Sequence, residues 1–317
     1  MTQEFQKPTV NFVRHALGQN RLGNGATASG TGPSGRLTST GDDMTRTRHL
    51  TSLTALAAAG ALLLSACGGG GSGEADGGNE YQLAQEGKLI MCSTLPYEPF
   101  EFTRDGESVG FDIDLAKKLA ERLDLEYELV DTGFEAIESA SVLDTQQCDI
   151  SLAGMTITDD RATKMDFTDA YLLDNLALMV RKDSGIKSIS ELKGKEVGVK
   201  QATTGEKYAQ EQGAETVQFE DNTIMIQAIS SGQVNAMVSN VSMIYSAVQT
   251  DDNLELVESY DTNEQLGAAV VKGNDKLAGE FNAMLGEMYE DGSYDELVDE
   301  WFGEVADAAR IPEDKRG

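Results

Sequence analysis

Short apolar runs alternate with amphipathic helical patterns along this chain of 317 residues, and this alternation occurs in two successive blocks. Each run has the length and the flanking turn residues of a buried strand. The six clearest runs cover residues 89–93, 126–130, 150–153, 197–199, 217–219 and 236–239. Because strands that alternate with helices form parallel sheets covered by those helices, the pattern predicts an α/β protein with two lobes.

Helical patterns and turn residues complete this prediction. Asp112 is a predicted cap for a helix that places Leu115, Leu119 and Leu123 on one face. We also expect a hairpin over 100–111 that turns at Asp105-Gly106. Further helices are predicted at 134–143, 204–212, 222–231, from about 241, and over 275–301. We expect the chain to cross between the two lobes at 179–181 and again at 267–271. Residues 81–180 and 271–317 then form lobe 1, and residues 181–270 form lobe 2.

The stretch AGMTITDDR, residues 153–161, is the most distinctive part of the first lobe. The strand stops at Gly154, and Thr158 is a predicted cap for the helical turn that contains Arg161. Arginine can hold a carboxylate by two parallel hydrogen bonds, so Arg161 is a candidate ligand residue. The alternative is a surface arginine paired with Asp159 or Asp160.

Ligands of open α/β sheets bind beyond the carboxyl ends of the strands. The residues at those ends here are aromatic rings, hydroxyls, two cations and an amide, with no evident nucleophile–base pair. They are Thr94, Tyr97, Phe134, Ala153, Gly154, Thr156, Arg161, Lys200, Thr203, Thr204 and Asn240. Such a set binds a small polar molecule, and we expect no catalysis.

Residues 44–66 have the features of a secretory signal: Arg46 and Arg48 precede an apolar run that ends in small residues. The run is short for a transmembrane helix. The ending Leu64-Ser65-Ala66-Cys67 resembles the lipobox of bacterial lipoproteins, and this resemblance implies cleavage before Cys67 and lipidation of its sulfur. We expect Met44 to be the true start, with 1–43 mis-called or disordered, and 67–80 to be a glycine-rich tether.

Charge and composition exclude several function classes. The formal net charge of −29 argues against nucleic acid or an anionic membrane surface as a partner. The only histidines, His15 and His49, precede Cys67, so the mature chain cannot build a Ser-His-Asp triad or a histidine-ligated metal site. We expect no metal and no cofactor. Cys92 and Cys148 remain after processing, and they form either a disulfide or two buried thiols.

Five separated motifs occur in order along the chain: PYEPFEF (96–102), GFDIDLAKKLA (110–120), CDISLAGMTITDDR (148–161), LKGKEVGVKQATTGE (192–206) and WFG (301–303). Together they resemble family 3 extracellular solute-binding proteins, which serve polar amino acid ABC transporters. The resemblance covers about residues 86–303. It implies a type II periplasmic-binding-protein fold: two lobes, two hinge crossings, and a ligand cleft between the lobes.

The resemblance also implies roles for the residues at the strand ends. Arg161 would hold the α-carboxylate of an amino acid, and Thr156 and Thr204 would donate to the same group. Tyr97 and Phe134 would sandwich the aliphatic part of the ligand. Ala153 and Gly154 would offer backbone groups to the α-ammonium. For Thr203 and Thr204, helix capping is an alternative or additional role.

Two positions depart from common family usage. Thr94 stands where members selective for cationic side chains often carry an acid, and Asn240 stands where most members have an Asp for the α-ammonium. Lys200 matches a position that glutamine-binding relatives use; otherwise it is a solvated lysine at a strand end. Together these residues favour glutamate, glutamine or a similar ligand over arginine or lysine.

The sequence therefore predicts a monomeric lipoprotein on the outer face of the cell membrane. It would capture a polar amino acid and deliver it to an ABC transporter permease. A non-amino-acid carboxylate remains an alternative ligand. A second alternative is an enzyme similar to cyclohexadienyl dehydratases, which share this fold.

Overall fold

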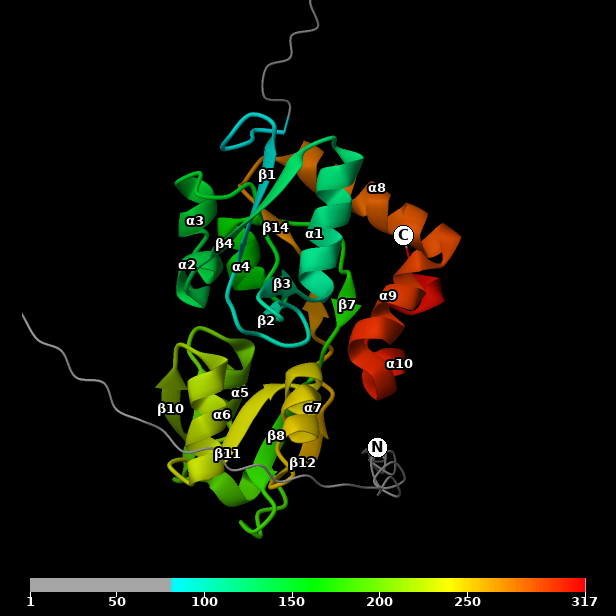
Figure 1. The fold of residues 1–317 in the computed structure, drawn as a ribbon. Coiled ribbons are helices and arrows are strands. Elements are labelled where there is room, and N and C mark those ends of the chain that lie inside the picture. The colour runs from blue at the N-terminus through cyan, green and yellow to red at the C-terminus, as the bar shows by residue number, and fades with distance from the viewer. Residues whose placement is uncertain (1–80, 317) are drawn as a thin grey trace, which may run out of the picture. The chain divides into compact units, whose positions relative to one another are not determined.

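The computed structural model describes residues 81–316, which fold around two five-stranded sheets (Figure 1). The first sheet has the order β4-β1-β5-β14-β6. Strands β1, β4 and β5 run parallel, and β14 is antiparallel to both β5 and β6. The strands are β1 (Lys88–Ser93), β4 (Glu126–Asp131), β5 (Ile150–Ser151), β6 (Asp166–Phe167) and β14 (Ala269–Val270).

The second sheet has the order β10-β9-β11-β8-β12. Strands β9, β10 and β11 run parallel, whereas β8 is antiparallel to β11 and β12. The strands are β8 (Leu176–Arg181), β9 (Glu196–Lys200), β10 (Glu215–Phe219), β11 (Ala236–Asn240) and β12 (Leu254–Tyr260). Both sheets are therefore mixed rather than purely parallel, because a strand that enters from the other lobe joins each of them.

The chain crosses between the two sheets at the short pair β7 (Leu172–Leu173) and β13 (Gln265–Leu266). The crossings predicted at 179–181 and 267–271 lie too late in the chain, because Met179 pairs with Met237 in the second sheet and Ala269 belongs to the first. The run 176–180 is buried throughout. A continuously apolar run fits a central strand of either sheet, so the sequence pattern alone does not show where the crossing ends.

Most predicted helices are present, and three details differ. The helix predicted over 134–143 is divided by Ala140, whose φ of 65° ends one helix and precedes the next. Gly292 divides the C-terminal helix in the same way. Asp112 does not cap the helix that contains it but is fully buried inside its first turn. The longer helices are α1 (Phe111–Arg122), α5 (Thr204–Glu211), α6 (Asn222–Ser231), α7 (Val241–Thr250), α8 (Asp275–Asp291) and α9 (Ser293–Phe302).

The C-terminal helices return to the first sheet, as expected. Helix α8 packs against α1 and β14, and Trp301 Nε1 in α9 donates a 2.9 Å hydrogen bond to Asp114. The predicted hairpin is also present, as β2 (Phe102–Arg104) and β3 (Glu107–Val109). These elements fix the first sheet on one side of the crossing pair, and helices α5 to α7 accompany the second sheet on the other (Figure 1).

Cys92 and Cys148 are joined by a disulfide, with their Cα atoms 5.7 Å apart. Between residues 81 and 316, no helix is both long and apolar enough to span a bilayer. Within the same range, no group of histidine, cysteine or acidic side chains is arranged to hold a metal ion. The leader, signal, lipidation and tether predictions concern residues 1–80 and lie outside the described part of the chain.

Candidate ligand-binding site

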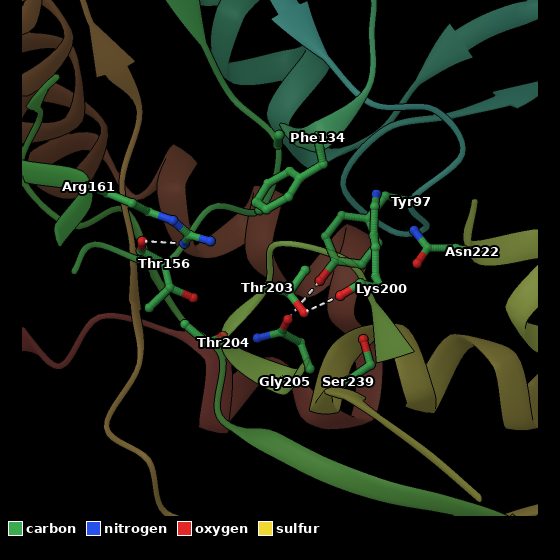
Figure 2. A pocket seen from close by; sticks show the side chains of 13 residues that line it. Tyr97, Phe134, Thr156, Arg161, Lys200, Thr203, Thr204, Gly205, Asn222 and Ser239 are labelled. Carbon is green, nitrogen blue, oxygen red and sulfur yellow. Dashed lines mark hydrogen bonds between the residues drawn. The ribbon is translucent and has the colours of Figure 1, made fainter. Parts of the chain in front are cut away.

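One pocket gathers residues from the carboxyl ends of strands in both sheets (Figure 2). It contains ten of the eleven residues predicted from the sequence. Its lining residues are Tyr97, Phe134, Ala153, Gly154, Thr156, Arg161, Lys200, Thr203, Thr204, Gly205, Asn222, Ser239 and Asn240. The eleventh predicted residue, Thr94, lies behind the wall, where its hydroxyl accepts a 3.4 Å hydrogen bond from Lys200 Nζ.

Arg161 is fixed at one end of the pocket. It lies in the short helix α4 (Asp159–Lys164), whose first turn is capped by Thr158, as predicted. Its guanidinium donates to the carbonyl of Thr156 at 2.8 Å and to the carbonyl of Ala202 at 3.0 Å. Arg161 is only 4% exposed, so the alternative of a surface arginine is wrong. A guanidinium has five N–H donors, so donors remain for a ligand anion.

The hydroxyls of Thr156 and Thr204 donate to one carboxylate oxygen of Glu264, at 2.6 and 2.9 Å. Their protons are therefore directed at Glu264, and the hydroxyls are not free donors for a ligand carboxylate. Burial raises the pKa of Glu264, while these two hydrogen bonds and the charge of Arg161 lower it. Glu264 was not singled out from the sequence, because it lies in the link between β12 and β13 and follows no strand end.

The amino end of α5 forms another part of the wall. Thr203 caps this helix by accepting from the amide of Glu206 at 3.2 Å, as predicted. The first amides of a helix have no partner inside the helix and carry its positive dipole end. Thr204 and Gly205 supply those amides at the pocket wall. This arrangement suits a carboxylate whether or not the Thr204 hydroxyl contributes.

Lys200 occupies the other end, with its ammonium between two aromatic rings. Its Nζ lies 5.4 Å from the ring centres of both Tyr97 and Phe134. Phe134 also contacts Arg161, whose Cζ is 5.3 Å from the ring centre, so this ring lies between the two cations (Figure 2). Burial lowers the pKa of Lys200 to about 8, although the charge of Glu101 acts to raise it. Tyr97 and Phe134 were expected to sandwich the aliphatic part of the ligand, and in the structure both rings contact the ammonium of Lys200.

Asn240 joins the two sides of the pocket. Its Oδ1 accepts from the hydroxyl of Tyr97 at 2.8 Å, and its Nδ2 donates to the carbonyl of Asp174 at 2.7 Å. These bonds fix the amide orientation, since a carbonyl can only accept. One lone pair of Oδ1 remains for a ligand, which is less than an aspartate at this position would offer.

Gly154 lies at the turn after β5, where only a residue without a side chain fits. Its φ is +53°, and a Cβ there would lie 2.6 Å from Cε1 of Tyr97. Its amide donates to buried Asp112 at 2.8 Å. With that N–H engaged elsewhere, Ala153 and Gly154 can offer the pocket their carbonyl oxygens.

Four residues at or behind the pocket wall were not predicted from the sequence: Gly205, Asn222, Ser239 and Glu264. Asn222 is the first residue of α6 and follows the predicted strand 217–219. Ser239 ends the predicted strand 236–239. Because ligands of open α/β sheets bind beyond the carboxyl ends of the strands, both residues could have been predicted as site residues. The pocket has a volume of about 20 Å³, which is room for about one water, so its walls must move apart to admit an amino acid.

The two α/β lobes hold a polar, aromatic-lined pocket between them, an arrangement that suits the binding of a small solute. The chain belongs to the bacterial extracellular solute-binding proteins, family 3, whose family model matches residues 89–304. The arginine-binding extracellular protein ArtP of Bacillus subtilis (strain 168) is 34% identical over 75% of this chain and 92% of its own length. The glutamine-binding protein GlnH of the same organism is 32% identical over 77% and 93%.

The same relationship holds in three dimensions. A solved structure described as an ancestral arginine-binding protein bound to glutamine is 34% identical, with a TM-score of 0.66 over 69% of this chain and all of that one. These relatives are named as binding proteins, and the chain has the type II periplasmic-binding-protein fold.

Proposed function

We propose that this protein captures a polar amino acid outside the cell and delivers it to an ABC importer. The observation that carries the proposal is the pair of buried cations, Arg161 and Lys200, that share Phe134. The spare donors of Arg161 and the α5 amides suit an α-carboxylate, whereas Lys200 suits an acceptor on the side chain. Two of the relatives that match most of the chain are named for arginine and for glutamine.

Glutamine or glutamate is the favoured ligand. A cationic side chain would have to share the ring cage of Tyr97 and Phe134 with the ammonium of Lys200. Like charges at such distances repel strongly when both are buried. Thr94 adds no acid that could offset this repulsion. Arginine is therefore a poor candidate, even though an arginine-binding protein is among the relatives.

A carboxylate without an ammonium is a second candidate ligand, because Asn240 brings no charge and is already bonded to Tyr97. A thermal-shift screen of the twenty amino acids and of simple dicarboxylates separates the two candidates. A ligand that binds only the native state raises the melting temperature. We expect glutamine or glutamate to give the largest shift. A screen in which no amino acid shifts wild type would contradict the proposal.

We further propose that the chain is anchored to the outer face of the membrane through a lipid on Cys67, and that it acts as a monomer with a permease as partner. The sequence 64–67 supports the anchor. Membrane fractions of cells that express Cys67→Ser test it: the variant should be released or left unprocessed. A processed variant that stays fully with the membrane would exclude lipidation.

A further inference from the structure

Asn222 places a polar atom without a partner at the pocket wall. The residue is 4% exposed and begins α6, where Asp221 already caps the helix through the amide of Ile224. Its Oδ1 is buried and has no hydrogen-bond partner within the described chain. A buried acceptor that is left unpaired is costly, so such an atom in a binding pocket calls for a donor from a ligand.

The orientation of the Asn222 amide is determined by its other contact. Nδ2 donates a 3.0 Å hydrogen bond to the carbonyl of Pro96. A carbonyl oxygen can only accept, so the NH2 group must face Pro96 and Oδ1 must be the remaining atom. Figure 2 shows Asn222 beside Tyr97 and Lys200. The same end of the pocket thus presents a donor, Lys200 Nζ, and an acceptor, Asn222 Oδ1.

We propose that Asn222 is a specificity-determining residue that selects a side chain ending in a primary amide, as in glutamine, over one ending in a carboxylate. This inference rests on the proposed function. An amide offers an oxygen for Lys200 and an N–H for Asn222, whereas a carboxylate has only acceptors and would place lone pairs against Oδ1. A site built around a buried acceptor rejects an analogue that lacks the matching donor.

Two substitutions separate the acceptor from the contact with Pro96. Asn222→Leu removes both, and Asn222→Asp removes the donor to Pro96 but keeps an acceptor facing the ligand. Titration calorimetry with L-glutamine and L-glutamate measures the affinity ratio for wild type and for each variant. Melting temperatures of the unliganded proteins report whether the variants fold.

We expect wild type to prefer glutamine at least about tenfold. Asn222→Leu should lose most of that preference, chiefly through weaker glutamine binding. Asn222→Asp should keep or increase the preference, because its charge repels glutamate. An equal loss for both ligands in both variants would mean that Asn222 only holds the Pro96 loop or orients Lys200, and would overturn the inference.

The outcome also separates this inference from the proposed function. A wild type whose best ligand is an amino acid without a terminal amide, such as glutamate or histidine, overturns the role of Asn222 alone. A wild type that binds no amino acid overturns both.

Discussion

The two ends of the pocket hold their cations in different ways. Arg161 is fixed by two hydrogen bonds to carbonyls that belong to segments on either side of the pocket. Lys200 has one hydrogen bond, at 3.4 Å, and otherwise lies against aromatic rings. The first end is preorganised for a group that every α-amino acid carries. The second end can rearrange, and it meets the part of the ligand that varies.

The acids near the two ends differ as well. Glu264 at the Arg161 end accepts two hydroxyl hydrogen bonds. Glu101 at the Lys200 end is fully buried, and this burial raises its pKa well above the ordinary value. In the described part of the chain Lys200 Nζ makes no hydrogen bond or ion pair with this carboxyl and donates to Thr94 instead. The ligand must then bring the complementary group, which places specificity at this end.

The largest effect should follow from breaking the fixed end. Arg161→Ala should lower the affinity for the best amino acid ligand by roughly 3–5 kcal/mol, since it leaves the ligand carboxylate buried without its partner. Calorimetry measures the loss, and the melting temperature of the unliganded variant controls for folding. An affinity within tenfold of wild type would show that the α5 amides, not Arg161, hold the carboxylate.

The movable end should give the next effect. Lys200→Met keeps the length of the side chain and removes the charge, so it should cost about 1.5–3 kcal/mol for glutamine or glutamate, the range for a hydrogen bond to a charged group. Arginine should bind the variant better than it binds wild type, because the like charge is gone. If arginine gains nothing, Lys200 is not what excludes cationic ligands.

Lys200 should also make wild-type binding depend on pH. Its pKa of about 8 lies below the ordinary value for lysine, so raising the pH from 7 to 9 converts it to a neutral amine. Affinity for glutamine or glutamate should therefore be nearly full at pH 7 and fall through about pH 8 as the pH rises toward 9. Titrations of Lys200→Met over the same pH range provide the control, and a matching fall in that variant would assign the effect to another group.

A smaller effect of opposite sign is expected from Glu264→Gln. The substitution removes a negative charge beside Arg161, while the amide oxygen of glutamine can still accept from the hydroxyls of Thr156 and Thr204. We expect a gain of about 1 kcal/mol, or roughly fivefold in affinity for a carboxylate ligand. Weaker binding of amino acids, with unchanged binding of simple carboxylates, would instead place the α-ammonium next to Glu264.

Asn240→Asp should have the smallest effect. From the sequence, a charged acceptor for the ammonium would strengthen binding by about 1–1.5 kcal/mol. In the structure, however, the change also removes the donor to the carbonyl of Asp174, worth about 0.5–1.5 kcal/mol. We therefore expect less than about a threefold change in the dissociation constant. A tenfold gain would show that the bond to Asp174 contributes little.

The sequence by itself predicted ten of the thirteen residues that line this pocket. Buried strands end where apolar runs stop, and the carboxyl ends of parallel strands lie at one edge of a sheet, so residues as far apart as Tyr97 and Lys200 could be assigned to one site. Helix caps at Thr158 and Thr203 were also predictable, because they depend only on neighbours within three residues.

Only the tertiary structure decided which polar atom pairs with which. The hydroxyl of Thr156 could have faced a ligand, but it donates to Glu264, 108 residues away. Asn240 could have been free, but it accepts from Tyr97, 143 residues away. Periodicity and motif spacing carry no information on such distances. The direction of each donor, and hence the acceptor that Asn222 leaves open, follows from how the two lobes pack.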